Sequence, residues 1–279
     1  MRLPTYRFVL LFVIVFLVVW TLFTVFPFYF QFITGFKSIG EVNQIYPSYW
    51  PQDFKWGNFP GLFDDARTLK SLIDSSIIAT CNTILSLLLG ASAGYALARF
   101  PRRAGGENVS FWILSNRMFP PVAILLPMFY AFEWVFGTTD NHISLIILYL
   151  VFNMPLATWL MMIFFREVPP ELEQASYMDG HGAIKTFFTV TLPLVGPGMV
   201  SVAMLCWIFA WNEYLFANLF VGGAVVTHTI QIPTFVQGAQ QLTNLAIAFS
   251  IIAMLPPIIL FIILRRYMVR GLSLGVVKG

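Results

Sequence analysis

The chain has 279 residues, of which 58% are hydrophobic, 17% are aromatic and only 10% are charged. An ordinary soluble domain carries about 25% charged residues, so these charges are too few to cover a soluble fold of this length. The composition indicates a protein of the lipid bilayer and excludes a soluble enzyme, a nucleic-acid-binding protein and a disordered scaffold. The net charge of +3 is too small to indicate a polyanionic partner.

Apolar runs in chain order predict six membrane-spanning helices. The first, residues 8–30, is uncharged and covers about 35 Å at about 1.5 Å per residue, enough to cross the hydrocarbon core. It is longer than a signal-peptide core and lacks a small-residue cleavage site, so we expect an uncleaved helix. The others lie at residues 71–98, 111–136 (interrupted by Pro120 and Pro121), 143–165, 196–221 and 245–264 (containing Pro256 and Pro257).

The distribution of basic residues predicts the orientation of these spans. With a cytoplasmic N-terminus, 11 of the 16 Lys and Arg residues lie inside, and four lie in one external loop, residues 34–70. An excess of basic residues in the inner loops fixes the orientation as N-in and C-in. The sequence therefore predicts an all-α polytopic membrane protein that forms one membrane domain over residues 1–279.

The predicted inner loop between spans four and five, residues 166–193, is unusually long and polar. Pro169 and Pro170 suit a first helical turn, where the acidic residues Glu171 and Glu173 complement the helix dipole. Gly180 then suits a left-handed helix C-cap, and a second short helix follows before Pro193. This pattern predicts a helix-turn-helix elbow, which either docks a cytoplasmic partner or only connects the two spans.

The elbow also resembles a known motif. Residues 174–180 read QASYMDG, and nine residues later residues 190–193 read VTLP. This is similar to the EAA loop of ABC-importer permeases, whose pattern is Glu-Ala-Ala, three residues, Gly, nine residues and Ile-x-Leu-Pro. Four further segments resemble the carbohydrate-importer branch of this family, in particular the shorter six-span subunit of maltose-type systems. They are GYALARF (94–100), RMFPP (117–121), WNEYLF (211–216) and the tail VRGLSLGVVKG (269–279).

The resemblance implies a permease core at residues 71–264 of an importer in a bacterial or archaeal cytoplasmic membrane. Its implied partners are a second homologous permease, two cytoplasmic ATPase subunits, an external substrate-binding protein, and a sugar or polyol as the solute. No cofactor is expected on this chain, because ATP and Mg²⁺ would bind the ATPase subunits. The residues implied in ATPase coupling are Glu171, Glu173, Gln174, Ala175, Ser176, Asp179, Gly180, Leu192 and Pro193.

Two details of the loop bear on this implication. Gln174 stands where the family has its first Glu, so an ion pair made by that Glu is absent here or is supplied by Glu171 or Glu173. The segment 180–186 looks like a phosphate-binding loop but fails the pattern, because Ile184 stands where Gly must precede Lys185. ATP hydrolysis must therefore come from a separate subunit.

Ionisable residues inside predicted spans form a candidate substrate path. Such groups are costly in a bilayer and usually face a bundle interior or a wet cavity. The candidate residues are Asn116, Arg117, Trp211, Asn212 and Glu213. Aromatic rings stack on sugar faces and amides bond hydroxyl groups, but an internal ion pair or interhelical hydrogen bonds explain the same residues, and we favour that structural explanation.

Other features favour structural explanations. The small residues from Gly90 to Gly94 predict close packing against a helix of this chain or of a partner permease. Asp74 lies near a span end, where solvent suffices. The three histidines lie far apart and the two cysteines lie in apolar runs, so neither a metal site nor a disulfide is expected.

Three other functions compete with the importer permease. An ion-coupled secondary carrier or channel does not explain the elbow, and an intramembrane enzyme would need a nucleophile-base or metal-ligand constellation that the spans lack. A permease for a non-sugar solute such as glycerol phosphate is the third alternative that the sequence leaves open.

Overall fold

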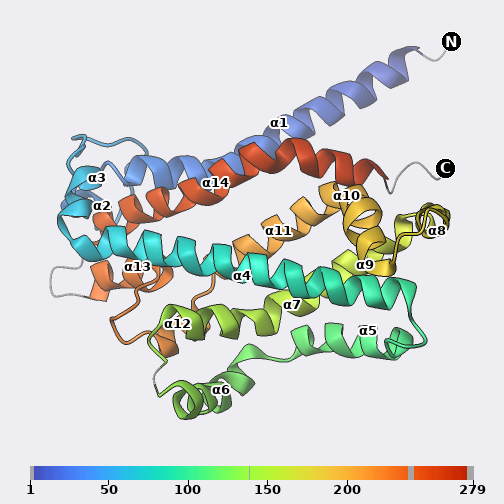
Figure 1. Cartoon of the computed structure of the whole chain (residues 1–279). Coiled ribbons are helices and arrows are strands. Elements are labelled where there is room, and N and C mark those ends of the chain that lie inside the picture. The colour runs from blue at the N-terminus through green and yellow to red at the C-terminus, as the bar shows by residue number, and fades with distance from the viewer. Residues whose placement is uncertain (1–2, 138, 238–241, 275–279) are drawn as a thin grey trace. The chain divides into compact units, whose positions relative to one another are not determined.

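The computed structural model describes residues 3–137, 139–237 and 242–274, and every regular element in these ranges is helical. In chain order (Figure 1) the helices are α1 Leu3–Thr34, α2 Ile39–Val42, α3 Asn58–Gly61, α4 Ala66–Arg99, α5 Gly106–Ser115, α6 Pro121–Phe136, α7 His142–Glu167, α8 Pro170–Met178, α9 Ala183–Thr186, α10 Leu192–Leu194, α11 Gly196–Trp211, α12 Leu215–Phe220, α13 His228–Gln237 and α14 Thr243–Leu274. Short 3₁₀ turns occupy Leu62–Asp64 and Asn116–Met118, and a π-helical segment occupies Phe187–Thr191.

Four helices are long and apolar enough to cross a membrane: Phe8–Thr34, Ala66–Arg99, His142–Glu167 and Thr243–Tyr267. Two helix pairs pass the same test but bend sharply, by 92° between Asn108–Met118 and Pro121–Phe136 and by 78° between Ala183–Leu194 and Gly196–Trp211. The structure therefore supports four to six spans by length and composition. The expected interruption at Pro120 is confirmed, because this residue is extended and caps α6.

The chain divides into two compact units, Met1–Thr68 with Ile232–Leu255 and Leu69–Gln231 with Pro256–Gly279. In the first unit, the Tyr49 ring lies against Phe26 and Phe30 of α1, with ring centroids 6.3 and 6.1 Å apart. Lys37 is buried there beside Glu41, and burial lowers the pKa of this lysine. The part of the segment 34–70 that lies in this unit is thus a packed structure that includes aromatic rings and one buried lysine.

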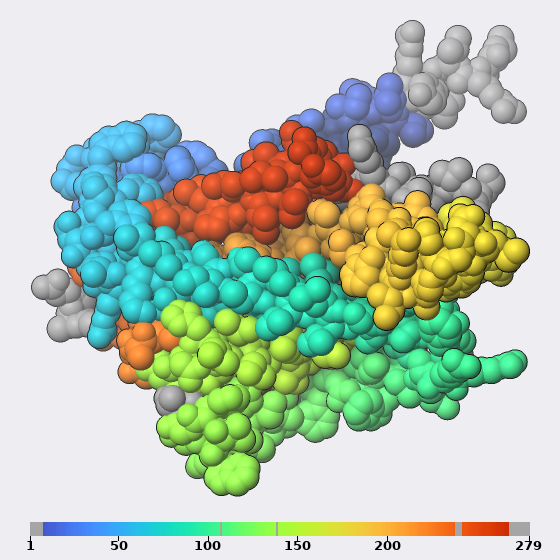
Figure 2. Space-filling model, in the orientation of Figure 1, coloured from blue at the N-terminus to red at the C-terminus, as the bar shows by residue number. Residues whose placement is uncertain are grey.

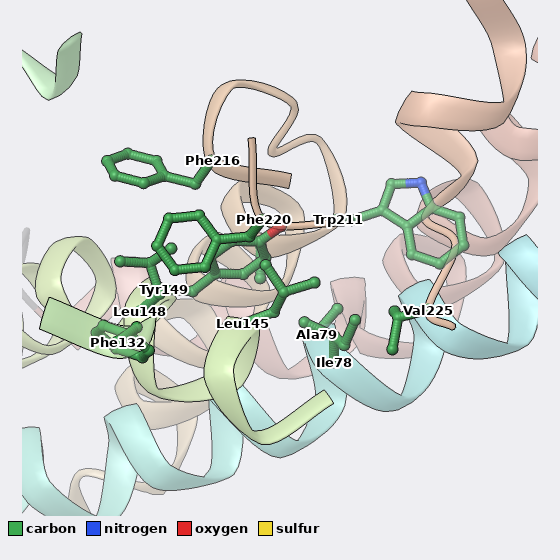
Figure 3. Packing of buried hydrophobic residues seen from close by; sticks show 11 residues of the cluster. Ile78, Ala79, Phe132, Leu145, Leu148, Tyr149, Trp211, Phe216, Phe220 and Val225 are labelled. Carbon is green, nitrogen blue, oxygen red and sulfur yellow. The ribbon is translucent and has the colours of Figure 1, made fainter. Parts of the chain in front are cut away.

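The second unit holds two hydrophobic clusters between α4, α7 and α11. The first gathers buried side chains of α4, α6, α7, α11 and α12, including Leu148, Trp211 and Phe220 (Figure 3). The second contains Tyr95, Met161, Phe165 and Cys206 and lies next to the start of the elbow at Val168. These clusters hold α7 against α11 and so fix the two ends of the loop that joins them.

Close packing of α4 and α7 depends on two glycines of α4. A Cβ atom on Gly90 would lie 2.6 Å from the Ala157 Cβ, and one on Gly94 would lie 2.8 Å from the Met162 backbone nitrogen. Such distances are sterically excluded, so only glycine permits this approach. The sequence left open whether this small-residue face packs against a helix of this chain or of a partner permease. In the structure it packs against α7 of this chain.

Candidate functional site

The connection from α7 to α11 forms the predicted helix-turn-helix elbow. Pro169 caps α8 and Pro170 is its first residue, as expected where no intrahelical N–H is needed. At the other end Gly180 has φ +81°, and its N–H donates to the Tyr177 carbonyl at 3.0 Å. The His181 N–H reaches back to the Ser176 carbonyl at 3.1 Å, which completes a Schellman motif. The predicted left-handed cap at Gly180 is confirmed.

The second half of the elbow returns the chain to the bundle. Helix α9 is followed by the π-helical segment and by α10, in which Pro193 occupies the first turn. The break comes at Val195, two residues after Pro193, where the chain bends by 78° into α11. The sequence placed this transition at Pro193 itself, and the difference arises because proline at a first helical turn is compatible with continuing the helix.

Helix α8 has one exposed and one buried face. Glu171, Gln174, Ala175 and Met178 are exposed at helical spacing, and Met178 is 88% exposed. Glu173 and Ser176 are buried. Of the remaining predicted coupling residues, Asp179, Gly180 and Pro193 are exposed and Leu192 is half-buried. Figure 2 shows α8 and α9 (yellow) at the surface of their unit, uncovered on the face in view.

The buried face of α8 carries a charged junction. The Arg99 Nε atom donates to the Glu173 Oε1 atom at 2.8 Å, and the Arg99 Nη2 atom donates to the Val168 carbonyl at 2.8 Å. Two hydroxyls also donate to this carboxylate, Tyr95 at 3.2 Å and Thr191 at 3.0 Å. The carboxylate therefore joins α4, α8 and the π-helical segment.

Ser176 fixes the two helices of the elbow to each other. Its hydroxyl lies 2.9 Å from the Thr186 hydroxyl and 3.1 Å from the His181 Nδ1 atom. Both Ser176 and Thr186 are buried. The elbow is thus internally bonded as well as anchored to α4.

The candidate substrate-path residues divide into two groups. Arg117 and Glu213 line one cavity of about 280 Å³, together with Tyr149, Asn153 and Phe209. Asn116 lines a separate cavity of about 380 Å³, and Trp211 is buried in the first hydrophobic cluster between Trp207 and His228. The Asn212 amide bonds the Ile208 carbonyl at 2.9 Å. The structure brings Arg117 and Glu213 together at one cavity, and the other three lie elsewhere.

Both charged residues of this cavity also have structural partners. The Arg117 Nη1 atom donates to the Phe152 carbonyl at 2.9 Å, and its guanidinium lies 4.4 Å from the Phe209 ring centroid. The Glu213 carboxylate accepts from the backbone N–H groups of Phe216 and Ala217 at 2.9 and 3.1 Å. Glu213 thus caps α12, which explains why α11 ends at Trp211 instead of continuing to residue 221 as predicted.

A buried amide pair behind the cavity was not identified from the sequence. The Asn153 amide donates to the Asn82 Oδ1 atom at 2.7 Å and to the Cys206 carbonyl at 2.9 Å, so it joins α4, α7 and α11. Among the described residues, the Asn153 Oδ1 atom has no hydrogen-bond partner. The sequence does contain a signal for this pair, because Asn82 and Asn153 are polar residues within two apolar spans. Such residues cost free energy in a bilayer unless they are paired.

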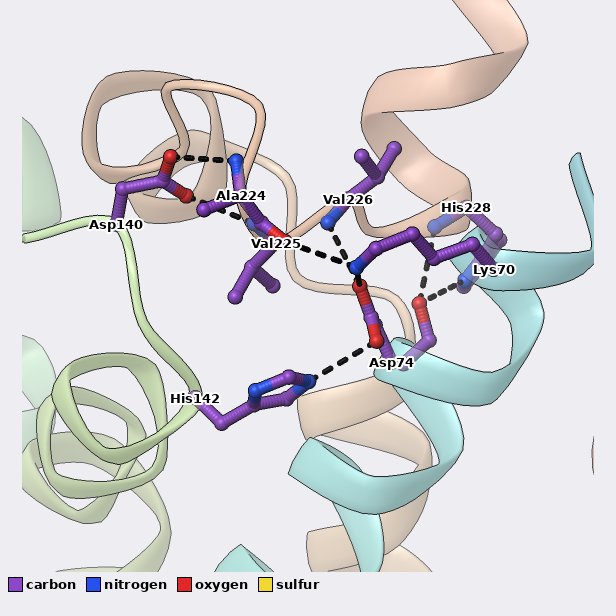
Figure 4. A network of polar contacts seen from close by, with 9 residues as sticks. Lys70, Asp74, Asp140, His142, Ala224, Val225, Val226 and His228 are labelled. Carbon is purple, nitrogen blue, oxygen red and sulfur yellow. Dashed lines mark hydrogen bonds and ion pairs between the residues drawn. The ribbon is translucent and has the colours of Figure 1, made fainter. Parts of the chain in front are cut away.

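Asp74 belongs to a second polar network (Figure 4) and is not left to solvent as expected. Its carboxylate accepts from the Val226 N–H at 2.9 Å, lies 3.0 Å from the His142 Nε2 atom and pairs with Lys70. Asp140 accepts from the Ala224 and Val225 N–H groups at 2.7 and 3.0 Å. The network ties residues 224–226 to the ends of α4 and α7.

The described part of the chain contains no group of three or more His, Cys, Asp or Glu side chains that could hold a metal ion. Cys81 and Cys206 are free thiols.

Comparison with known proteins finds a matching family and several relatives. Residues 86–274 match the family described as "Binding-protein-dependent transport system inner membrane component". The chain is 36% identical over 234 residues to the trehalose transport system permease protein SugB of Mycobacterium tuberculosis, covering 82% of this chain and 84% of that protein. It is 32% identical over 257 residues to the melibiose/raffinose/stachyose import permease protein MelC of Bacillus subtilis, covering 91% of each.

The fold has a solved counterpart as well. A chain in the crystal structure of a bacterial ABC transporter that imports the acidic polysaccharide alginate superimposes with a TM-score of 0.79 at 20% sequence identity. The match covers 96% of this chain and 99% of that chain. At this identity the similarity establishes the fold.

Proposed function

Since the chain belongs to the family of binding-protein-dependent transport system inner membrane components, whose members are permease subunits of ABC importers, we propose here its solute, its partners and its topology. The chain is a permease subunit and not an enzyme, as are its relatives. The solute that we propose is a carbohydrate or polyol delivered by an external binding protein. The names of the relatives, which transport trehalose, raffinose-type sugars and maltodextrin, support this class.

The cavity beside Arg117 supports a hydroxyl-rich solute. It offers a guanidinium, the Glu213 carboxylate, the Tyr149 phenol and the Asn153 amide, with Phe209 as an aromatic wall. Such groups can donate to and accept from sugar hydroxyls, while an aromatic ring packs against the apolar face of a sugar ring. The unpartnered Asn153 Oδ1 atom can accept a hydroxyl hydrogen. Arg117 and Glu213 therefore remain in the proposed path, and Asn116, Trp211 and Asn212 would contribute by holding the surrounding helices.

The exposed face of α8 carries the proposal about coupling. Glu171, Gln174, Ala175 and Met178 form a surface with polar edges and an exposed methionine, on a helix fixed to the bundle by its opposite face. A rigid element with one uncovered amphipathic face suits docking in a groove of a cytoplasmic ATPase subunit. Asp179, Gly180, Leu192 and Pro193 would maintain the turn and the return of the chain.

The proposed assembly contains this chain, a second homologous permease and two ATPase subunits, in a bacterial or archaeal cytoplasmic membrane. ATP and Mg²⁺ would bind the ATPase subunits. Closure of these subunits would move the elbows and switch the spans from inward-facing to outward-facing. The topology that we propose has six spans with both termini inside, a permease core at residues 71–264, the docking loop at 166–193 and the external loop at 34–70, all in one membrane domain.

Affinity purification of the tagged full chain from its native membrane tests this proposal. The expected result is co-purification of a second permease and an ATPase whose hydrolysis rises with binding protein and a sugar. A complex stimulated by glycerol phosphate but by none of the sugars or polyols would move the solute to the alternative class. Purification of the chain without any ATPase, together with ion-driven solute movement, would favour the secondary carrier.

A further inference from the structure

The Glu173–Arg99 ion pair lies between the docking helix and the bundle. The exposed fraction of the Arg99 side chain is 11% and that of the Glu173 side chain is 5%, so the pair is largely screened from water. Glu173 comes from α8 and Arg99 from the last turn of α4, a helix long enough to span the membrane. The pair therefore connects the elbow to a span that is remote from it in sequence.

Several further bonds complete this connection. Arg99 bonds the Val168 carbonyl at the point where α7 ends, and Thr191 donates to the Glu173 carboxylate from the π-helical segment. Tyr95, one turn before Arg99, donates to the same carboxylate, and its ring packs against Phe165 and Phe187 at centroid distances of 5.4 and 4.7 Å. A displacement of α8 alone would break the bonds from Arg99, Tyr95 and Thr191 to Glu173 together and leave a charged group buried without its partner, which is strongly unfavourable.

We infer that Glu173 and Arg99 form a latch that makes α8 and the inner end of α4 move as one body, so that displacement of the docking helix reaches this span directly. This inference rests on the proposed function, because it assigns a positioning role within the coupling step. The latch acts in addition to the covalent link from the elbow to α11.

Gln174 lacks the charge of the family's first Glu, and either Glu171 or Glu173 could supply it. The latch distinguishes between these two acids. The Glu173 carboxylate faces inward and is occupied by Arg99, Tyr95 and Thr191. Glu171 is exposed on the docking face together with Gln174. Glu171 is therefore the acid available to a basic group of the ATPase subunit, and Glu173 serves the bundle.

A double variant separates transmission from folding. Glu173→Leu with Arg99→Met removes both charges, so no buried charge is left unpaired and the bundle should still fold. We expect the complex to retain its ATPase subunits and to hydrolyse ATP, while solute transported per ATP falls about tenfold, within the usual range of coupling between sites. Arg99→Lys, which preserves the charge, should retain most of the transport per ATP.

The matched control is Lys55→Gln with Asp53→Asn. It removes an ion pair of opposite charges that are 48% and 69% exposed and lie outside the docking loop, in the segment 34–70. The control should match the wild type in assembly, hydrolysis and transport. A folded latch variant with the wild-type ratio of transport to hydrolysis would overturn the inference. Loss of the ATPase from the folded latch variant would also overturn it, because Glu173 would then be a docking contact.

A distance measurement on the intact latch does not depend on the folding of the variant. Spin labels at Leu172 on α8 and at Leu88 on α4, which are 44% and 61% exposed and lie outside the proposed docking face, report the separation of the two helices. We expect the same distance in nucleotide-free and ATP-trapped complexes, and a clear change between these states would overturn the latch. Absence of ATP-dependent uptake by the wild-type complex would instead contradict the proposed function.

Discussion

At the scale of single residues, Gly94 determines how closely two spans pack. A Cβ atom there would lie 2.8 Å from the Thr158 carbonyl oxygen and 2.8 Å from the Met162 backbone nitrogen. Backbone atoms cannot move away as a flexible side chain can, so α4 and α7 would have to separate. The same α4 carries Arg99, and the separation would reach the latch.

Gly94→Ala should therefore lower the free energy of unfolding by about 1–3 kcal/mol, the usual cost of overpacking a core. Thermal unfolding of the purified complex in detergent measures the effect. Gly40→Ala is the matched control, because a Cβ atom at Gly40 meets nothing within 4 Å. Equal midpoints for the two variants would show that α4 and α7 do not pack as described.

His228 is buried at the start of α13 and stacks on Trp211 at a centroid distance of 4.3 Å. Its backbone N–H donates to the Ser75 Oγ atom at 2.9 Å, so the Ser75 hydroxyl hydrogen can bond the His228 Nδ1 atom, 3.1 Å away. This arrangement suits a neutral ring, and burial lowers the pKa of His228 to about 4.

A lowered pKa in the folded state makes stability depend on pH in a fixed direction. Above the ordinary pKa of about 6.5 the ring is neutral in both states, and its contribution to stability is complete. As the pH falls from about 6.5 to about 4, only the unfolded state takes up the proton, and about 3 kcal/mol of stability is lost. Unfolding midpoints of the wild type and His228→Gln, measured across this range, should converge as the pH falls. Parallel curves would contradict a buried neutral histidine.

Residue types alone did not predict which candidate site residues share a cavity. Arg117 lies in the 3₁₀ turn Asn116–Met118 and Glu213 lies between α11 and α12, yet both line one cavity. Trp211, two residues from Glu213, instead points into the hydrophobic core. The direction of each side chain depends on where α11 ends, and that end is set by the bonds from Glu213 to the α12 backbone. A capping carboxylate inside an apolar run leaves no periodic signal in the sequence.

At the scale of elements, the elbow is the part that the sequence predicted in most detail. Paired prolines, acidic first-turn residues and a glycine cap act locally, so their structural effect can be predicted without tertiary contacts. The anchoring of the elbow by Arg99 could not be predicted, because this contact joins residues 74 positions apart. The division of α8 into a docking face and an anchoring face follows only from that contact.

Substitution of Gly180 tests the geometry of the elbow. Gly180→Val places a β-branched residue at φ +81°, which costs about 1–2 kcal/mol locally and should reorient α9. We expect loss of ATPase docking or of transport per ATP. Gly182→Val is the control, because Gly182 has φ −77° and a Cβ atom there meets nothing within 4 Å. Normal assembly and transport with Gly180→Val would contradict the elbow as the docking element.

Gln174 tests whether the docking face lacks a charge. Gln174→Glu restores the acid of the family pattern at an exposed position, where an ion pair contributes about 0.2–1 kcal/mol. Affinity for the ATPase subunit should stay equal or rise by up to about fivefold, as measured by titration of the purified permease pair. Gln52→Glu adds the same charge at an exposed position in the segment 34–70 as a control. A strong loss of transport with Gln174→Glu alone would show that a neutral residue is required there.

At the scale of the whole molecule, composition predicted the membrane class and hydropathy predicted where the spans lie. The third predicted span bends by 92° at the pair Pro120–Pro121. Helix α11 ends ten residues before the predicted end of its span at 221, next to Glu213, whose carboxylate bonds the first turn of α12. The division into two compact units has no counterpart in the sequence pattern, because it depends on which helices pack together.

Solute uptake into vesicles is the decisive test of an ATP-driven import function. Vesicles would contain this chain, its partner permease and the ATPase subunits, with the binding protein on the opposite side from the ATP and a labelled sugar as solute. We expect uptake that requires ATP and binding protein, persists when ionophores collapse ion gradients, and disappears with Gly180→Val. Uptake driven by an ion gradient in vesicles that lack the ATPase subunits would contradict this function.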